Sequence, residues 1–186
     1  MATTHDELRD IALAEFARAG YNATSLQRIA ELAGVSKSSV LYHFASKEAL
    51  LEAAIAPALE RFEGIVTGLA NGDDRDTFVA GFVDLVIEHT LELHMFINQG
   101  ASLEDVPAFE RANELAVRIA QHFATTTQGA LERMRFGIAL GGAAYLMASQ
   151  QQFSLEPAET NDEIRVALIT IVTDLLAPVP VRSTTP

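Results

Sequence analysis

The chain lacks cysteine and tryptophan altogether. Without cysteine it forms no disulfide bond, offers no thiolate to a metal ion and has no cysteine nucleophile. Three enzyme motifs are missing as well: no histidine has a glutamate three residues before it, and neither H-E-x-x-H nor G-x-S-x-G occurs. Di-iron bundles, zinc proteases and serine hydrolases use these motifs. We therefore expect no metal, no cofactor and no catalytic activity.

No apolar run is long enough to cross a membrane. The longest, residues 136–148, is rich in glycine and alanine. The first ten residues contain acidic side chains and no apolar run, so no signal peptide is visible. We expect a cytoplasmic protein that does not associate with membranes.

Alternating runs of β-branched residues, the pattern of half-buried strands, are also scarce. Alanine and leucine abound instead, and hydrophobic residues make up 49% of the 186 residues, enough to bury a sizeable core. The composition predicts an all-α protein of about nine helices, built as one large or two small units.

Basic residues are few: 13 lysines and arginines stand against 25 acidic residues, a formal net charge of −12. Residues 1–50 carry five basic and six acidic residues, a net charge of −1, whereas residues 51–186 carry eight and nineteen, a net charge of −11. Because salt limits the reach of exposed charges to about 8–10 Å, the N-terminal part can still contact a phosphate backbone.

Residues 25–47 have the pattern of two short helices joined by a glycine turn. Apolar residues recur three or four positions apart from Leu26 to Ala33, which places them on one helix face. Gly34 stands where the left-handed residue after a helix is expected. Side chains that accept the first free N–H groups of a helix are expected at three helix starts: Thr24 or Ser25, Ser36, and Ser46.

The second of these helices is unusual for a protein surface. From Leu32 to Lys47 the chain has two lysines, one histidine, two aromatic rings and four serines, but no carboxylate. Serines let a backbone approach base edges, and lysine and tyrosine bind phosphates, so the composition suits a helix in the major groove of DNA. Val40, Leu41 and Phe44 are expected to anchor it. A solvated helical hairpin without DNA contact is the alternative.

The order of these pieces resembles the DNA-binding domain of the TetR family of one-component transcriptional regulators. The resemblance covers residues 8–52, about a quarter of the chain. The matching pieces are Ala14–Phe16, Gly20-Tyr21-x-x-Thr24-Ser25, Ile29-Ala30-x-x-Ala33-Gly34-Val35-Ser36, Leu41-Tyr42-His43-Phe44 and Lys47-Glu48-x-Leu50-Leu51. One departure is that many members have one more residue between the tyrosine and the histidine–phenylalanine pair.

The resemblance implies a homodimer whose two recognition helices enter successive major grooves of a pseudo-palindromic, double-stranded DNA operator. The residue types then suggest the contacts. Base contacts are expected from Lys37, Ser38 and Ser39. Phosphate contacts are expected from Thr24, Ser25, Arg28, Ser36, Tyr42, His43 and Lys47. An ion pair with Glu15 or Glu31 is the alternative for Arg28.

Beyond Lys47 the apolar periodicity predicts longer helices. One covers residues 47–69 and is expected to kink at Pro57. The next, residues 77–98, is apolar on most of its circumference, as central buried helices are. It predicts a pocket for an apolar small-molecule effector. The expected lining is Phe78, Phe82, His94, Met95, Asn98, Phe123 and Tyr145, with His89, Phe96 and Phe109 as further candidates.

Three more helices are expected, at residues 108–124, 130–151 and 162–176. The last two carry more apolar surface than one neighbour in a monomer covers, so we expect them to form a four-helix dimer interface with a second copy. Their burial in the monomer core is the alternative. The proline-rich tail, residues 179–186, is expected to be disordered.

The sequence therefore predicts a helix-turn-helix DNA-binding domain over residues 1–47 and a helical ligand-binding and dimerisation domain over residues 48–178. The expected function is that of a ligand-responsive transcriptional regulator, most simply a repressor. The alternative is a helical dimer that binds protein through the helix pair. The acid-free helix favours DNA, because a protein-binding surface has no need to exclude carboxylates.

Overall fold

The computed structural model describes residues 4–127, 129–149 and 160–177. These residues form nine α-helices and one short 3-10 helix, with no strand among them, so the expected all-α architecture is confirmed. In chain order the elements are α1 His5–Ala19, α2 Leu26–Leu32, α3 Lys37–His43, α4 Lys47–Asn71, α5 Arg75–Glu88, α6 Thr90–Gln99, η1 Gly100–Ser102, α7 Pro107–Thr126, α8 Ala130–Ser149 and α9 Asn161–Leu176.

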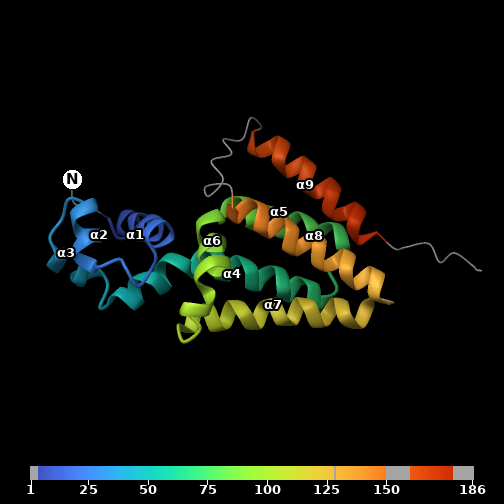
Figure 1. Cartoon of the computed structure of the whole chain (residues 1–186), viewed down its shortest axis with the longest axis horizontal. Coiled ribbons are helices and arrows are strands. Elements are labelled where there is room, and N and C mark those ends of the chain that lie inside the picture. The colour runs from blue at the N-terminus through green and yellow to red at the C-terminus, as the bar shows by residue number, and fades with distance from the viewer. Residues whose placement is uncertain (1–3, 128, 150–159, 178–186) are drawn as a thin grey trace, which may run out of the picture.

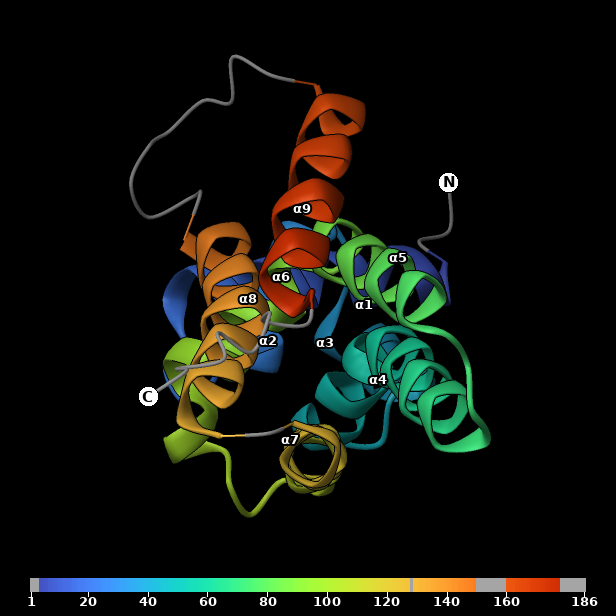
Figure 2. The same cartoon turned by 90° about the vertical axis from the view of Figure 1, so that its right-hand side faces the viewer.

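Helices α1, α2 and α3 gather at one end of an elongated molecule, and the longer helices occupy the rest (Figure 1). α4 starts beside the first three helices and extends into the second group. Seen along the long axis, α9 lies at the outer edge (Figure 2), where it packs against α5 and α8. α4 is therefore a continuous connection between the two ends of the molecule.

The bounds of α1 follow from two local signals. The Thr4 side chain accepts the N–H of Glu7 and the Glu7 side chain accepts the N–H of Thr4, which completes a capping box. At the other end Gly20 has a φ of 90° and donates its N–H to the Phe16 carbonyl. A side chain at position 20 would strain this conformation.

The turn between α2 and α3 has the predicted glycine geometry. Gly34 has a φ of 67°. Its N–H donates to the Glu31 carbonyl at 3.2 Å, and the N–H of Val35 donates to the Ala30 carbonyl at 2.9 Å. This pair of bonds is a Schellman motif, which ends α2 and directs the chain into α3.

Three serines cap the helices that follow. Of the two predicted candidates at α2, Ser25 is the cap and accepts the Arg28 N–H at 3.1 Å. Ser36 accepts the N–H of Ser39 at the start of α3, and Ser46 accepts that of Ala49 at the start of α4. Each cap satisfies a donor that the helix itself leaves unpaired.

α1, α2, α3 and the start of α4 close around a small apolar core. Its fully buried larger side chains are Leu8, Phe16, Ile29, Val40, Leu50 and Leu51. Val40 and Phe44 anchor α3 as predicted. The prediction that Leu41 is a third anchor is wrong, because this side chain is exposed, about 100° around the helix from Val40. The core thus fixes which face of α3 points outward.

α4 runs without interruption from Lys47 to Asn71 and includes Pro57. Gly72, with a φ of 96° in the left-handed region, ends it. The helix begins where the sequence predicts and extends two residues beyond the predicted end. The kink at Pro57 stays a prediction.

The prediction of one helix over residues 77–98 is wrong. Two helices, α5 and α6, occupy this stretch, because His89 has a φ of −118° and a ψ of 45°, outside the helical region. The His89 ring stabilises the bend through a 3.0 Å hydrogen bond between its Nδ1 and the Glu92 carboxylate. α6 consequently leaves the direction of α5 (Figure 1) and packs against α1 and α8.

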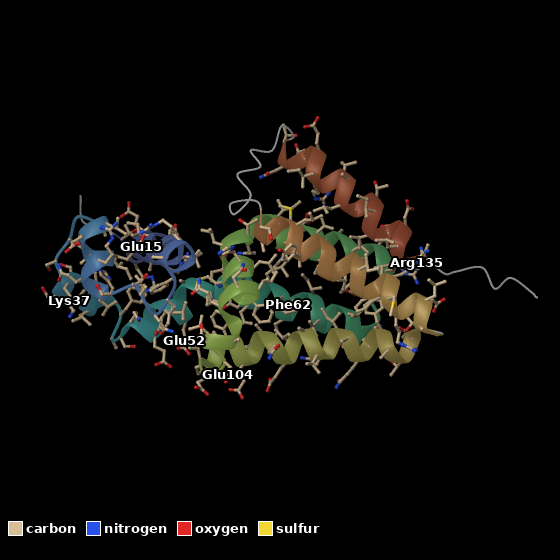
Figure 3. All side chains as sticks on the ribbon, in the orientation of Figure 1. Glu15, Lys37, Glu52, Phe62, Glu104 and Arg135 are labelled. Carbon is tan, nitrogen blue, oxygen red and sulfur yellow. The ribbon has the colours of Figure 1, made fainter. Side chains whose placement is uncertain are left out.

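The three C-terminal helices agree with the predicted ones to within two residues wherever the structure describes them. Residues 150–151 of the predicted 130–151 helix and the predicted tail, residues 179–186, lie outside the described residues. The Arg135 guanidinium on α8 donates to the Leu175 carbonyl at 2.8 Å and to the Asp174 carbonyl, which ties α8 to the end of α9 (Figure 3).

The described residues contain neither a membrane-spanning helix nor a group of side chains suited to a metal ion. None of their helices combines the length and apolar character that a membrane span requires. No three of their histidine and carboxylate side chains form a group that is suited to hold a metal ion.

Candidate nucleic-acid interface and ligand cavity

The outward face of α3 is polar, basic and free of acids. Lys37, Ser38, Ser39, Tyr42 and His43 are all exposed, and Tyr42 is 86% exposed. Lys37 lies at the far end of the molecule from α9 (Figure 3). These side chains lie on the sides of α3 that do not face the core. Because Val40 is buried in the core, they are exposed to solvent. The structure therefore brings together five of the ten residues predicted to contact DNA.

Ser36 organises the start of this face. Its Oγ accepts the N–H of Ser39 and lies 2.8 Å from the Oγ atoms of both Ser38 and Ser39. The three hydroxyl groups hold one another in position at the exposed N-terminus of α3. Small hydroxyl side chains here allow close approach of another molecule to the helix.

Thr24 and Ser25 have structural roles in the loop before α2. Thr24 is buried, and its Oγ1 donates to the Gly20 carbonyl at 2.9 Å. The Ser25 hydroxyl accepts the N–H of Arg28. Both hydroxyl groups thus serve the loop and the start of α2, although Ser25 remains exposed.

Lys47, predicted to contact phosphate, points into the protein. Its Nζ donates to the carbonyls of Tyr21 and Thr24, each at 3.0 Å, and lies 4.1 Å from the centre of the Tyr21 ring. Burial lowers the pKa of this ammonium group. In this conformation Lys47 braces the loop between α1 and α2 against α4, and its phosphate contact stays a prediction.

Arg28 pairs with Glu15, one of the two ion-pair partners predicted as the alternative to a phosphate contact. Its Nε donates to the Glu15 carboxylate at 3.2 Å, and Arg18 donates to the same carboxylate from two nitrogens, at 2.9 and 2.8 Å. The hydrogen bonds from Arg18 hold the pKa of the buried Glu15 carboxyl below its ordinary value, although burial opposes them. Glu15, labelled in Figure 3, joins α1 to α2. Arg28 remains exposed and retains further N–H donors.

The second group of helices surrounds a partly open cavity of about 310 Å³. Its walls come from α4, α5, α6, α7 and α8 and are almost entirely apolar. Phe62 of α4, labelled in Figure 3, lies among them. Of the described residues that line it, His89 and Glu92 alone have polar side chains. The cavity is at the lower end of the size range for small-molecule sites in proteins.

One of the seven residues first predicted to line a ligand pocket, Phe82, lines this cavity. Phe78 and Met95 are buried in the core, and Phe123 stacks on Phe136 with ring centres 4.0 Å apart. His94, Asn98 and Tyr145 are placed elsewhere. His94 donates to the Ala148 carbonyl, Asn98 donates to the His94 carbonyl, and Tyr145 is exposed on α8.

The three further candidates, His89, Phe96 and Phe109, all line the cavity. Sequence reasoning missed the contribution of α4, which includes Ile55, Leu59 and Phe62. Their spacing of three or four residues marked an apolar face on α4. That signal identified a buried face but did not distinguish a cavity wall from solid core.

A family model described as "Bacterial regulatory proteins, tetR family" matches residues 8–54. The repressor KstR2 of Mycobacterium tuberculosis is 31% identical over 109 residues, 55% of this chain and 54% of that protein. The regulator RutR of Escherichia coli K12 is 51% identical over 49 residues, 26% of this chain and 23% of that protein. The chain thus spans about half the length, or less, of these curated relatives.

Solved structures share the overall fold. The structure of KstR2 from M. tuberculosis has a TM-score of 0.66 at 16% identity and covers 91% of this chain and 93% of its own. The structure titled as probable transcriptional regulatory protein RHA5900 has a TM-score of 0.64 at 20% identity, over 95% and 100% of the two chains. At such identities the likeness establishes the fold alone. Residues 8–54 of this chain are thus similar to the bacterial regulatory proteins of the tetR family.

Proposed function

We propose that this chain is a ligand-responsive transcriptional repressor that binds a pseudo-palindromic DNA operator as a homodimer and leaves it when an apolar small molecule binds. KstR2 is known as a transcriptional repressor and RutR as a transcriptional regulator. These descriptions are of those proteins, and their transfer to this chain is our inference. We place its action in the cytoplasm.

The observation that carries the proposal is the outward face of α3. A helix held in the core by Val40 exposes a lysine, serines, a tyrosine and a histidine with no carboxylate between residues 32 and 47. We propose base contacts from Lys37, Ser38 and Ser39. Phosphate contacts are proposed for Arg28, Ser36, Tyr42 and His43. Ser25, exposed at the start of α2, is a further proposed phosphate contact, and Thr24 and Lys47, which bond within the protein, support this surface.

Dimerisation is proposed through α8 and α9. On α8 the exposed apolar side chains Leu131, Met134, Ile138 and Tyr145 recur at three-, four- and seven-residue spacings, which align them on one face. Val166 and Ile171 on α9 are exposed as well. A second copy of the same two helices would bury these side chains in a four-helix interface. Two recognition helices would then meet the two halves of the operator.

Domain boundaries are part of the same proposal. We propose a DNA-binding domain over residues 1–47 and a ligand-binding and dimerisation domain over residues 48–178. The start of α4 at Lys47 supports this division. The family model extends to residue 54 and α4 packs against α1, so we propose that the first turns of α4 carry movements of the DNA-binding domain into the second domain.

The experiment is DNA binding by fluorescence anisotropy. The full chain is titrated onto a labelled duplex from the region upstream of its own gene, and onto a scrambled duplex, at two salt concentrations. We expect tight binding to the first duplex that weakens with salt, because lysine and arginine contacts release counterions. Equal binding to both duplexes at low salt would contradict the proposal.

Two matched variants test the assignment to α3. Lys37→Ala and Arg118→Ala each remove one positive charge from an exposed side chain, on α3 and α7 respectively. We expect Lys37→Ala to lower operator affinity about tenfold, as expected for one lost base contact. Arg118→Ala should bind like the unmodified chain. Similar affinities of the two variants would remove α3 as the recognition helix.

A further inference from the structure

The cavity has one polar site in an otherwise apolar wall. His89 and Glu92, at the junction of α5 and α6, are joined by a 3.0 Å hydrogen bond between the ring Nδ1 and a carboxylate oxygen. Their side chains are 19% and 12% exposed, so both are largely shielded from bulk water. A polar pair in such surroundings fixes the position of any hydrogen-bonding group on a bound molecule.

The hydrogen bond between His89 and Glu92 determines which hydrogen-bonding group the pair offers to a ligand. A carboxylate accepts but does not donate, so the Nδ1 of His89 carries the hydrogen. In the neutral ring the other nitrogen, Nε2, is then an acceptor. Among the described residues, no hydrogen bond engages this Nε2 atom. The pair therefore presents an acceptor to a ligand that has a hydrogen to donate.

The charged side chains that line the cavity further restrict the kind of ligand that it binds. Neither lysine nor arginine is among the described residues that line the cavity. An anionic ligand would lose its hydration without gaining a cationic partner and would meet the Glu92 carboxylate, so its burial is costly. The rest of the wall, including Phe62, Phe96 and Phe109, offers apolar contact alone.

Size completes the description. At about 310 Å³ the cavity is at the lower end of the size range for small-molecule sites, so we expect a small ligand. In a small ligand a single hydrogen bond contributes a substantial part of the binding selectivity.

We propose that the cavity binds a small, neutral, largely apolar molecule that carries one hydroxyl group, and that the hydroxyl donates its hydrogen to Nε2 of His89. Glu92 acts as a positioning residue, which holds the ring and its tautomer through Nδ1. The inference rests on the proposed function, in which this cavity receives the effector.

Two isomeric probes test the hydroxyl directly. 1-Decanol and 1-methoxynonane have the same composition and nearly the same length, but the alcohol alone has a hydrogen to donate. Isothermal titration calorimetry on the full chain should show 1-decanol binding about fivefold tighter, the expected effect of one hydrogen bond. Decanoate, an anionic chain of similar length, should bind at least about tenfold more weakly than the alcohol.

Three variants test which residues cause the preference for the alcohol. His89→Phe should abolish the preference for the alcohol over 1-methoxynonane, whatever the affinity that the two isomers then share. Glu92→Leu should reduce the preference, because the ring loses the partner that orients it. Ala112→Leu, which fills part of the cavity, should weaken both isomers alike. Melting curves establish that each variant is folded, and Glu92→Leu provides the test if His89→Phe is not.

Several outcomes would overturn the proposal: equal affinity of the unmodified chain for the two isomers, tighter binding of decanoate than of the alcohol, or no binding of 1-decanol up to its solubility limit. A preference for the alcohol that survives in both His89→Phe and Glu92→Leu would do the same. These titrations contain no DNA. A chain that prefers 1-decanol but ignores the operator would therefore refute the proposed function and leave the ligand site intact.

Discussion

The side chain of Gln99 on α6 donates from Nε2 to the carbonyl of Phe16 on α1 at 3.0 Å. The Oε1 of the same side chain accepts the N–H of Tyr21 at 2.8 Å. One carboxamide therefore pairs with an acceptor and a donor at the end of α1, across 83 residues of sequence. Because α6 also lines the cavity, this contact joins the wall of the ligand cavity to the helices that support α3.

We expect Gln99→Ala to loosen the loop after α1. The Tyr21 N–H loses its acceptor, so its hydrogen exchange should accelerate at least about fivefold, the effect expected for one lost hydrogen bond. Asn98→Ala is the matched control, because the Asn98 amide bonds within α6, to His94. Exchange at Tyr21 that is equally fast in both variants would show that Gln99 does not hold this loop.

The same variant tests whether the contact carries the ligand signal. A ligand changes DNA affinity only to the extent that it binds the two conformations of the protein differently. With 1-decanol as the ligand, we expect the ratio of operator affinities without and with ligand to fall about threefold or more in Gln99→Ala. Anisotropy titrations measure this ratio. An unchanged ratio would show that the Gln99 contact does not carry the coupling.

Lys37 and Lys47, the two lysines of the N-terminal part, should differ in their contribution to the free energy of unfolding. Lys47 bonds two carbonyls and lies over the Tyr21 ring, whereas Lys37 is exposed. We expect Lys47→Ala to lower the free energy of unfolding by about 1–3 kcal/mol. Lys37→Ala should change it by less than about 0.5 kcal/mol, as at an ordinary surface site. Urea denaturation compares them, and equal losses would mean that the Lys47 contacts contribute nothing.

Much of the N-terminal part was predictable because its signals are local. Thr4 with Glu7, Ser36, Ser46 and Gly34 each act on a helix end within a few residues, so the sequence contains the whole interaction. By the same reasoning the sequence offered two caps for α2, and the structure was needed to choose Ser25.

The features that could not be predicted from the sequence depend on contacts between distant segments. The break at His89 carries no glycine or proline, and it is stabilised by Glu92 and by the packing of α6 against α1 and α8. Lys47 reaches carbonyls more than twenty residues away. Whether an apolar residue lines a cavity or fills the core depends on five helices at once. Periodicity cannot show this, so the sequence wrongly predicted that Phe78 and Met95 line the pocket.

The Glu15 cluster predicts a dependence of stability on pH. Hydrogen bonds from Arg18 lower the pKa of the folded Glu15 carboxyl below its ordinary value of 4.5. As the pH falls, the unfolded chain therefore takes up this proton before the folded chain does. The stabilisation is complete above about pH 4.5 and is lost as the pH falls through the folded pKa.

Glu15→Gln removes this contribution. We expect the urea midpoint of the variant to lie below that of the unmodified chain at neutral pH, and the gap to narrow as the pH is lowered below about 4.5. Glu60→Gln changes an exposed carboxyl on α4 and serves as the control. A gap for Glu15→Gln that stays constant with pH would exclude a charged role for Glu15.

The proposed dimer makes the last prediction, because it requires a partner for the exposed side chains of α8. Ile138 is 63% exposed in a single copy of the chain. Placed in a four-helix interface, an aspartate there would be a buried, unpaired charge, which costs several kcal/mol. We expect Ile138→Asp to be monomeric by light scattering coupled to size exclusion, at concentrations where the unmodified chain is a dimer. It should also lose affinity for a two-half-site operator.

Val117→Asp is the matched control. Val117 is an apolar residue on α7, away from the proposed interface, and it is 51% exposed. The aspartate at this position stays in water and should leave the dimer intact. If both variants remain dimeric, the interface lies on another surface. If both become monomeric, the effect is one of general destabilisation, which melting curves of the two variants would reveal.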